Sequence, residues 1–313
     1  MKSDTNYAKL SGKRVLITGV NGFVGRHLAE YLHAGGVGVS GTRRSNDGPL
    51  PGWVNGHSLS LPANEKQLDT VLAGCDFVVH LAGRVHQRDE EGDDLRQAYH
   101  SVNVLGTLQL ARQAVRAGVK RFVFVSTIKV NGERTFGRPF TAADQSAPLG
   151  DYAVSKYEAE QGLLEIAVRQ GLEVVIVRPP LVYGDEVKGN LARLQGLIKK
   201  GVPLPLASIR NKRDLISIGN LCDVIAITLV HPAAANEIFL VADGVPFSTP
   251  DLVRFLAGKT GRRARLFPFP VSLLRLAGTM TSRKPLVDRL CDSLEVNTEK
   301  TVTVLGWHGI PPR

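Results

Sequence analysis

Three side chains near the middle of the sequence could exchange a proton with the hydroxyl group of a ligand. Tyr152 and Lys156 are four positions apart in a stretch with helical spacing, and Thr127 follows a run of apolar residues. Side chains at positions i and i+4 of a helix lie on one face, a turn apart. A neighbouring ammonium group stabilises a phenolate, and so moves the pKa of a tyrosine from its ordinary value of about 10 toward neutrality. The pattern predicts a catalytic acid/base site made of Thr127, Tyr152 and Lys156.

A glycine-rich turn near the amino terminus could bind a diphosphate. The apolar run Arg14–Thr18 leads into Gly19-Val-Asn-Gly22-Phe-Val-Gly25 and then into a stretch with helical spacing. Backbone N–H groups and the helix dipole favour anions at a helix amino terminus. A glycine turn between a strand and a helix is typical of dinucleotide-binding units. We therefore expect Gly19 to permit the tight turn, Gly22 to let the pyrophosphate approach, and Gly25 to allow close contact between helix and sheet.

The residues after the second expected strand bear on the choice of dinucleotide. An NAD-binding unit usually carries an acid there, which binds the ribose 2′-hydroxyl. This sequence has Arg43-Arg44-Ser45 instead. Guanidinium groups suit a 2′-phosphate, although two solvated loop arginines are the alternative. NADP(H) is the favoured cofactor, with NAD(H) as the second choice.

Short apolar runs alternate with helical stretches over the first 180 residues. Strands are expected at Arg14–Thr18, 37–39, 76–81, 122–125 and 174–177. Strands that are apolar throughout are buried on both faces, as in a parallel sheet covered by helices on each side. The fold class is therefore α/β, with a doubly wound parallel (Rossmann) sheet. The fourth of these strands ends on Ser126 and Thr127, which places two hydroxyls at the carboxyl edge where such sheets bind ligands.

After Pro179-Pro180 the alternation loosens, and prolines separate shorter helices. This change predicts a smaller C-terminal cap over the carboxyl edge of the sheet. We expect a dinucleotide-binding Rossmann domain with the catalytic residues at 11–180. Residues 181–313 would form mainly the substrate-binding cap, with some segments that could return to the sheet.

Composition excludes several classes of protein. Hydrophobic residues make up 43% of the 313 positions and charged residues 22%, which is enough for a large core. The sequence has no apolar run of the length of a signal peptide or a membrane span. Cys75, Cys222 and Cys291 are scattered and lack the spacing of metal ligands, so we expect no metal, reduced thiols and a cytoplasmic protein. His80, at the end of an apolar run, is expected to be a core histidine.

The chain is basic, with a formal charge of +10 and a pI of about 9.7. Its cations occur as dispersed pairs rather than as clusters interleaved with aromatic residues, so nucleic acid is not the expected partner. Small phosphorylated ligands, or loose attraction to an anionic membrane surface, account for the charge equally well.

The chain resembles the extended short-chain dehydrogenases/reductases, in particular their nucleotide-sugar epimerases, dehydratases and reductases. The motifs that carry the resemblance run along the whole chain. They are TGxxGFxG at 18–25, His80-Leu81-Ala82-Gly83, Asn103 before Gly106-Thr107, Tyr152 with Lys156, and Arg178-Pro-Pro-Leu-Val-Tyr-Gly184.

The resemblance implies a role for each matching residue. Thr127 would hold the reacting sugar oxygen, Tyr152 would act as acid and base, and Lys156 would bind the ribose and tune the tyrosine. The implied cofactor contacts are Gly19, Asn21, Gly22, Phe23, Val24, Gly25, Arg43, Arg44, Leu81, Ala82, Gly83, Asn103, Ser126, Tyr152, Lys156 and Pro179. The implied substrate contacts are Arg84, His86, Thr127, Asn190, Arg213 and Arg289, with Arg283 as a rival to Arg289.

Two further implications concern the adenine and the assembly. Residues 56–62 contain no acid, whereas the family often has an aspartate there for the adenine, so the sequence departs from the family pattern at this contact. The family also leads us to expect a homodimer formed through helices at 95–117 and 151–170.

The pair Ile128-Lys129 narrows the chemistry. Dehydratases of this group carry Asp-Glu after the threonine for acid/base work, and neither isoleucine nor lysine can replace those carboxylates. A 4-ketoreductase and a 4-epimerase with tightly bound NAD remain. Arg43 and Arg44 favour a reductase that uses NADP(H). Several short sequence segments also resemble the reductases of bacterial O-antigen synthesis, which reduce a UDP-linked 2-acetamido-2,6-dideoxy-4-keto-hexose.

Three questions stay open at this point. UDP-glucose or UDP-N-acetylglucosamine 4-epimerisation is the first alternative, and a non-catalytic dinucleotide-binding sensor is the second, because fold does not fix function. The sequence does not give the face of hydride attack. Nor does it distinguish a UDP-linked sugar from one carried on a lipid diphosphate.

Overall fold

Seven parallel strands form the central sheet of the structure, a computed structural model that describes residues 9–44, 47–85, 93–187 and 189–312. In chain order the strands are β1 (Arg14–Thr18), β2 (Gly38–Arg43), β3 (Val54–Ser58), β4 (Phe77–His80), β5 (Arg121–Val125), β6 (Glu173–Arg178) and β9 (Glu237–Leu240). The order across the sheet is β3-β2-β1-β4-β5-β6-β9, and every neighbouring pair is parallel. The predicted doubly wound Rossmann sheet is confirmed.

Two strands at one side of the sheet differ from the expected set. β2 extends to Arg43, well past the expected apolar run at 37–39, because its polar residues are buried. A side chain at Gly41 would lie within 2.6 Å of Val20, so only glycine lets this part of the strand pack. β3 was not among the expected strands, since it lies at the edge of the sheet and only its first residue, Val54, is buried.

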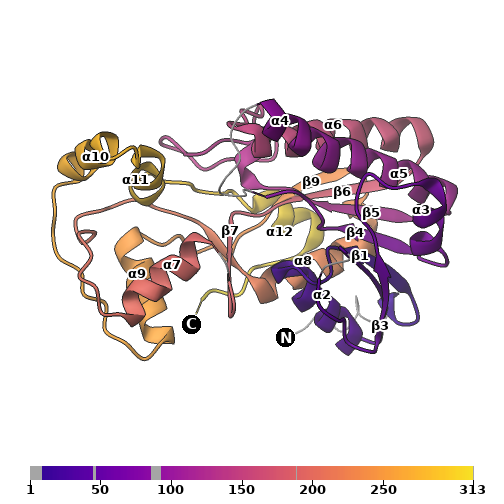
Figure 1. The fold of residues 1–313 in the computed structure, drawn as a ribbon, viewed down its shortest axis with the longest axis horizontal. Helices are drawn as coiled ribbons and strands as arrows, with labels where there is room; N and C mark the ends of the chain where they lie inside the picture. The colour runs from indigo at the N-terminus through magenta and orange to yellow at the C-terminus, as the bar shows by residue number, and fades with distance from the viewer. Residues whose placement is uncertain (1–8, 45–46, 86–92, 188, 313) are drawn as a thin grey trace.

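Helices cover both faces of the sheet (Figure 1). They are α2 (Phe23–Ala34), α3 (Glu65–Leu72), α4 (Asp93–Tyr99), the π-helix η1 (His100–Gly106), α5 (Thr107–Arg116), α6 (Asp151–Gln170), α8 (Ile218–Val230) and α12 (Glu299–Leu305). Successive strand residues point to opposite faces. Accordingly Val15 and Ile17 pack in the core shared with α2 and α8, whereas Leu16 packs in the core shared with α3, α5 and α6.

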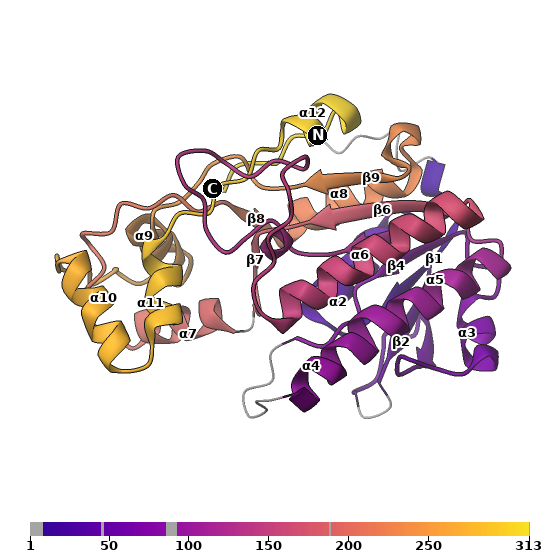
Figure 2. The same ribbon diagram turned by 90° about the horizontal axis from the view of Figure 1, so that it is seen from above.

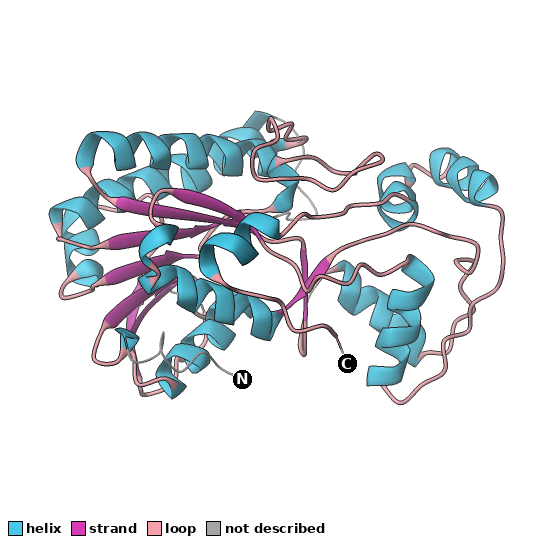
Figure 3. Ribbon diagram, turned by 180° about the vertical axis from the view of Figure 1, so that it is seen from behind, coloured by secondary structure: helices cyan, strands magenta, loops and turns pink. Residues whose placement is uncertain are grey.

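A smaller helical region lies beyond the carboxyl edge of the sheet. It contains α7 (Asn190–Lys199), α9 (Thr249–Lys259), α10 (Val271–Met280) and α11 (Lys284–Cys291), which share their own apolar core. A two-stranded parallel ribbon of β7 (Leu181–Tyr183) and β8 (Leu215–Ser217) lies between these helices and the sheet (Figure 3). The β9 arrow points toward this cap (Figure 2), so the carboxyl ends of all seven parallel strands face it.

Candidate active site

The turn between β1 and α2 forms a cradle suited to a diphosphate. Gly19 has φ of +69°, and a Cβ there would lie 3.2 Å from the backbone of Ala82, at the end of β4. A Cβ on Gly25 would lie 2.2 Å from the carbonyl oxygen of Gly19. The N-cap of α2 is Gly22, which provides no side-chain cap, and the first turn of the helix has no acid. The amino-terminal N–H groups of α2 are thus available for an anion, as a dinucleotide requires.

A buried hydrogen-bond chain fixes the ends of β1 and β4 beside this cradle. Thr18 Oγ1 accepts bonds from the backbone N–H groups of Leu81 and Ala82, both at 3.1 Å, and lies 2.7 Å from His80 Nδ1. With its acceptor capacity used, the hydroxyl donates to Nδ1, so His80 Nε2 carries the hydrogen and donates to Thr107 Oγ1 at 2.9 Å. Burial lowers the pKa of His80 to about 3, helped by the charge of Lys156. His80 is therefore a neutral core histidine, as predicted.

Asn103 connects the segment after β4 to α6. It lies in the π-helix η1 and is 1% exposed. Its Oδ1 accepts from the backbone N–H of Arg84 at 2.7 Å, and its Nδ2 donates to the carbonyl of Arg84 at 3.1 Å and to Ser155 Oγ at 3.0 Å. Single π-helical turns often occur at functional sites. Through these bonds Asn103 holds the segment after β4 against α6.

The end of β5 presents Ser126 and Thr127 at the carboxyl edge. Ser126 donates its backbone N–H to the carbonyl of Val177 at 2.8 Å, yet its buried Oγ has no hydrogen-bond partner among the described residues. A buried hydroxyl is normally hydrogen-bonded, so this orphan oxygen fits a site that a cofactor completes. Thr127 caps a short 3₁₀ turn, η2 (Ile128–Val130), and its Oγ1 accepts from the backbone N–H of Lys129 at 3.3 Å. The carbonyl of Pro179 accepts from the backbone N–H of Ile128 at 2.9 Å, which ties β5 to the end of β6.

Tyr152 and Lys156 lie on the first two turns of α6, in strongly desolvated surroundings. Burial, with the phenol of Tyr99 nearby, raises the pKa of Tyr152 to about 12. The rings of Tyr99 and Tyr152 are 6.3 Å apart, edge to face. Lys156 is 4% exposed, and its Nζ lies 3.8 Å from the centre of the Phe124 ring. Burial lowers the pKa of Lys156 to about 7, although Glu160 opposes this shift.

The sequence did not single out Tyr99. Its buried position at the end of α4 depends on how η1 packs against α6.

Asp47, which the sequence prediction overlooked, contacts both arginines at the end of β2. Arg43 Nη1 donates to the carbonyl of Asp47, while the backbone N–H of Arg44 donates to Asp47 Oδ2 at 3.1 Å. A hydrogen bond from Asn21 lowers the pKa of Asp47, and the charges of Arg44 and Arg43 act in the same direction. An acid thus contacts the glycine turn close to where a dinucleotide ribose would lie. The sequence did contain one signal for this contact, namely an acid four residues after Arg43.

Three of the predicted substrate residues, Asn190, Arg213 and Arg289, lie after β6, on the cap side, whereas Arg84 and Thr127 follow β4 and β5. The backbone of Arg213 forms isolated β-bridges with two other segments of the chain. Its side chain donates from Nη1 to the carbonyl of Asp292 at 2.9 Å. Burial lowers its pKa, the charges of Glu133 and Asp292 oppose this shift, and the charge of Arg289 adds to it. Asn190 begins α7. Arg283, the rival to Arg289, is the exposed N-cap residue of α11. His86 lies outside the described residues.

Lys129 has a partner of its own. Its Nζ is 2.8 Å from Glu133 Oε1, and both side chains are 27% exposed. A half-buried ion pair explains the lysine without a ligand. This ion pair does not change the argument against dehydration, because the carboxylates of the dehydratases are still missing at these positions.

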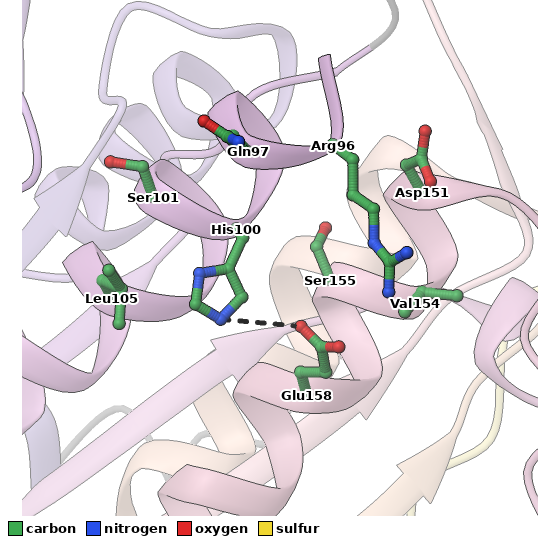
Figure 4. A pocket seen from close by; sticks show the side chains of 9 residues that line it. All are labelled: Arg96, Gln97, His100, Ser101, Leu105, Asp151, Val154, Ser155 and Glu158. Carbon is green, nitrogen blue, oxygen red and sulfur yellow. Dashed lines mark ion pairs between the residues drawn. The ribbon is translucent and has the colours of Figure 1, made fainter. Parts of the chain in front are cut away.

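The pocket drawn in Figure 4 lies beside α6, the helix that carries Tyr152 and Lys156. Its volume is about 540 Å³, and it lies between α4 with η1 on one side and α6 on the other. Its lining residues are Arg96, Gln97, His100, Ser101, Leu105, Asp151, Val154, Ser155 and Glu158. His100 Nε2 and Glu158 Oε2 are 3.9 Å apart. On α6 the lining positions lie on a different face from Tyr152 and Lys156.

Two absences concern the described residues alone. They contain no group of three His, Cys, Asp or Glu side chains that could hold a metal ion. None of their helices is both long enough and apolar enough to cross a membrane.

Comparison with known proteins gives matches along nearly the whole chain. The model of the family described as "NAD dependent epimerase/dehydratase family" matches residues 15–242. A UDP-glucose 4-epimerase of Vibrio cholerae is 41% identical over 310 residues, which are 96% of this chain and 92% of the relative. An N-acetyl-alpha-D-glucosaminyl-diphospho-ditrans,octacis-undecaprenol 4-epimerase of Escherichia coli O157:H7 is 26% identical over 264 residues, 83% and 77% of the two chains. The solved UDP-glucose 4-epimerase of Thermotoga maritima has a TM-score of 0.75 at 21% identity, over 95% of this chain and 93% of that one.

Proposed function

We propose a reaction from the premise that this chain belongs to the NAD dependent epimerase/dehydratase family, and is an enzyme of the extended short-chain dehydrogenase/reductase type. The reaction is 4-epimerisation of a UDP-linked hexose. One observation carries this choice: the 41% identity to a UDP-glucose 4-epimerase extends over 96% of the chain. The complete set of Thr127, Tyr152 and Lys156 at the carboxyl edge of the sheet supports catalysis over a sensor role.

Each catalytic side chain has a task at C4 of the sugar. The cofactor, when bound, supplies the site that accepts and returns a hydride. Tyr152 removes the proton of the C4 hydroxyl as that carbon is oxidised, and returns a proton when it is reduced from the other face. Thr127 holds the same oxygen through its hydroxyl. Lys156 favours the phenolate through its charge, which matters because burial raises the pKa of Tyr152 to about 12.

The other proposed contacts to the substrate are assigned from the charge and polarity of the side chains. Arg213 and Arg289, two cations on the cap side, would bind the diphosphate of the UDP-sugar. Asn190 would add an amide contact from the start of α7, and Arg84 and His86 would approach the sugar. The relative from Escherichia coli O157:H7, whose name specifies a lipid diphosphate, makes a lipid-linked sugar the second substrate class to test.

The reduction of a UDP-linked 4-keto sugar is the second candidate function. The observation that favours it is the Arg43-Arg44 pair at the end of β2, because guanidinium groups suit the 2′-phosphate of NADPH. Both reactions use the same catalytic residues, so the cofactor side of the site distinguishes them.

One experiment separates the two reactions. The purified protein is first denatured to release and identify any bound dinucleotide. It is then incubated with UDP-glucose or UDP-N-acetylglucosamine, and separately with NADPH and a UDP-4-keto-6-deoxy sugar. Epimerisation gives the C4 epimer of the UDP-hexose with no net change in cofactor. Stoichiometric loss of NADPH with the keto sugar, and no conversion of the UDP-hexoses, would instead establish the reductase.

The Arg43→Asp variant tests the cofactor preference. If Arg43 binds a 2′-phosphate, its replacement removes a charge-assisted contact and weakens NADPH binding by roughly tenfold to a hundredfold, with little effect on NADH. Fluorescence titration of both cofactors measures the two affinities. Arg169→Asp, on the exposed end of α6, is the matched control. Equal losses for NADPH and NADH would show that Arg43 serves only to hold Asp47, which would favour NAD.

We also propose a homodimer in the cytoplasm. The helices α4, η1, α5 and α6 provide the contact, and the pocket in Figure 4 would then face the partner. Cys75, Cys222 and Cys291 are free thiols, which supports a reducing compartment. Sedimentation velocity measures the assembly directly.

A further inference from the structure

Helix α10 carries an apolar stripe that no described part of the chain covers. Leu273, Leu276 and Met280 are 49%, 55% and 79% exposed, and Ala277 lies between them on the same face. Their spacing of i, i+3, i+4 and i+7 makes one continuous stripe along the helix. An apolar side chain exposed singly is ordinary, but a continuous stripe of them is not.

The opposite face of α10 is the one that packs. A Cβ at Gly278 would lie 2.7 Å from Val287 Cγ2, so the glycine brings α10 close to α11. Leu274, also on this side, joins the core of the cap. Since the inner face accounts for the packing of the helix, the outer stripe has no role in the fold of the cap.

Basic residues surround this stripe in the sequence. Residues 252–287 contain eight Lys or Arg and no Asp or Glu. Three of the eight pair with acids from outside the segment or at its border: Arg254, Arg275 and Lys284. Within the part of the chain that the structure describes, Arg262, Arg263, Arg265 and Arg283 form no ion pair, and all four are exposed. The segment is therefore strongly cationic beside an exposed apolar stripe.

The arrangement in space brings these features to one end of the molecule. Figures 1 and 2 show α10 at the end of the cap furthest from the seven-stranded sheet, with the segment between α9 and α10 running along the same end. Arg265 also lies close to the end of α7, because a Cβ on Gly201 would be 3.9 Å from its guanidinium carbon. Lys199 and Lys200, both exposed, precede that glycine and add to the charge.

We propose that this end of the cap, the α10 stripe with Arg262, Arg263, Arg265 and Arg283, docks on an anionic lipid bilayer. A helix with an apolar face and flanking cations lies in the interface of a bilayer, where its apolar side chains enter the boundary of the acyl chains. Each Lys or Arg near an anionic surface strengthens the binding roughly fivefold. The stripe is short for stable insertion by itself, so binding depends on both the apolar stripe and the charge.

Charge complementarity is what selects the lipid surface over a second protein. A segment that has no acid at 36 consecutive positions, 252–287, and keeps four exposed arginines without an ion pair among the described residues suits a uniformly anionic partner. Nucleic acid would call for several aromatic residues exposed among the cations. In the segment 252–287 only one aromatic residue, Phe267, is exposed, and the α10 stripe contains no aromatic residue. Docking does not depend on the proposed reaction, because it is measured without turnover. It would bring the neighbouring substrate side of the cap close to a bilayer that presents lipid-linked sugars.

Co-sedimentation of the full chain with vesicles tests the proposal. The vesicles contain phosphatidylcholine alone or with about 30% phosphatidylglycerol. We expect at least roughly tenfold stronger partition to the anionic vesicles, lost when salt rises from about 0.05 M to about 0.5 M. Leu276→Asp should lower partition about tenfold or more by placing a charge in the apolar stripe. The double variant Arg262→Glu with Arg263→Glu should lower it to a similar degree.

A matched control separates the stripe from general surface effects. Ile310, 60% exposed near the carboxyl terminus, provides it: Ile310→Asp should leave partition unchanged. Equal binding to both kinds of vesicle, or no effect of Leu276→Asp and the arginine variant in folded protein, would overturn the proposal. So would a loss of oligomers in Leu276→Asp with unchanged vesicle binding, which would identify the stripe as a contact between copies of the chain.

Discussion

Tyr152→Phe is expected to lower turnover by about 10²–10⁴-fold while leaving cofactor affinity nearly unchanged. The substitution removes one oxygen, the atom that exchanges a proton with the C4 hydroxyl. Phenylalanine keeps the ring and its edge-to-face contact with Tyr99, whose ring centre lies 6.3 Å away. Turnover of the UDP-sugar and dinucleotide affinity by fluorescence are the two measurements.

The same helix supplies the control for this prediction. Tyr157 lies five residues further along α6 and is half-buried, but no catalytic role falls to it. Tyr157→Phe should therefore retain close to normal turnover. An active Tyr152→Phe enzyme would mean that another group transfers the proton. Tyr99→Phe would then be the next variant to measure, because its phenol lies beside the same ring.

The parts of the site that could be predicted from the sequence are those fixed by local patterns. The glycine turn at 19–25 is defined by neighbours in the chain, because a strand before it and a helix after it suffice to place a diphosphate at the helix terminus. Tyr152 and Lys156 are likewise one turn apart on one helix. Their desolvation is a different matter, since the pKa of about 7 for Lys156 comes from burial among distant segments.

The features of the site that could not be predicted from the sequence depend on contacts between residues far apart in the chain. The relevance of Asp47 to the cofactor side of the site becomes clear only from its hydrogen bond with Asn21, which lies in the glycine turn 26 positions earlier. Without that contact Arg43 and Arg44 looked like two unopposed cations, and the preference for NADP(H) followed from them. With it, the cofactor preference becomes a question of whether a 2′-phosphate can compete with a carboxylate already in place.

Lys129 illustrates the same limit. Its identity, and that of Ile128, was enough to argue against dehydration because neither can act as a carboxylic acid. Its own function needed a partner, and Glu133 at 2.8 Å is that partner. The i, i+4 spacing of the two residues could have predicted the pair, had a helical turn been expected after β5.

A buried ion pair beside Lys156 gives the second large effect. Arg178 and Glu160 are 2% and 0% exposed, and Arg178 Nε donates to Glu160 Oε1 at 3.0 Å. Arg178 also donates to Asn131 Oδ1 at 2.9 Å, so the pair joins β6, α6 and the segment after η2. Glu160 is one turn beyond Lys156 on the catalytic face and opposes the fall of its pKa. The pair therefore supports both the fold and the charge of Lys156.

Glu160→Ala should lower the free energy of unfolding by about 3–5 kcal/mol, because it leaves the guanidinium of Arg178 buried without its counter-charge. Urea unfolding followed by circular dichroism measures this loss. Glu165→Ala is the matched control: its carboxylate pairs with Arg169 on the same helix, where the side chains are 56% and 73% exposed. The loss there should stay below about 0.5 kcal/mol. The double variant Glu160→Leu with Arg178→Met removes both charges, and should be less destabilised than Glu160→Ala, since replacing a whole buried pair by apolar groups is often near neutral. A double variant as unstable as Glu160→Ala would show that the cost comes from lost packing, and not from an unpaired charge.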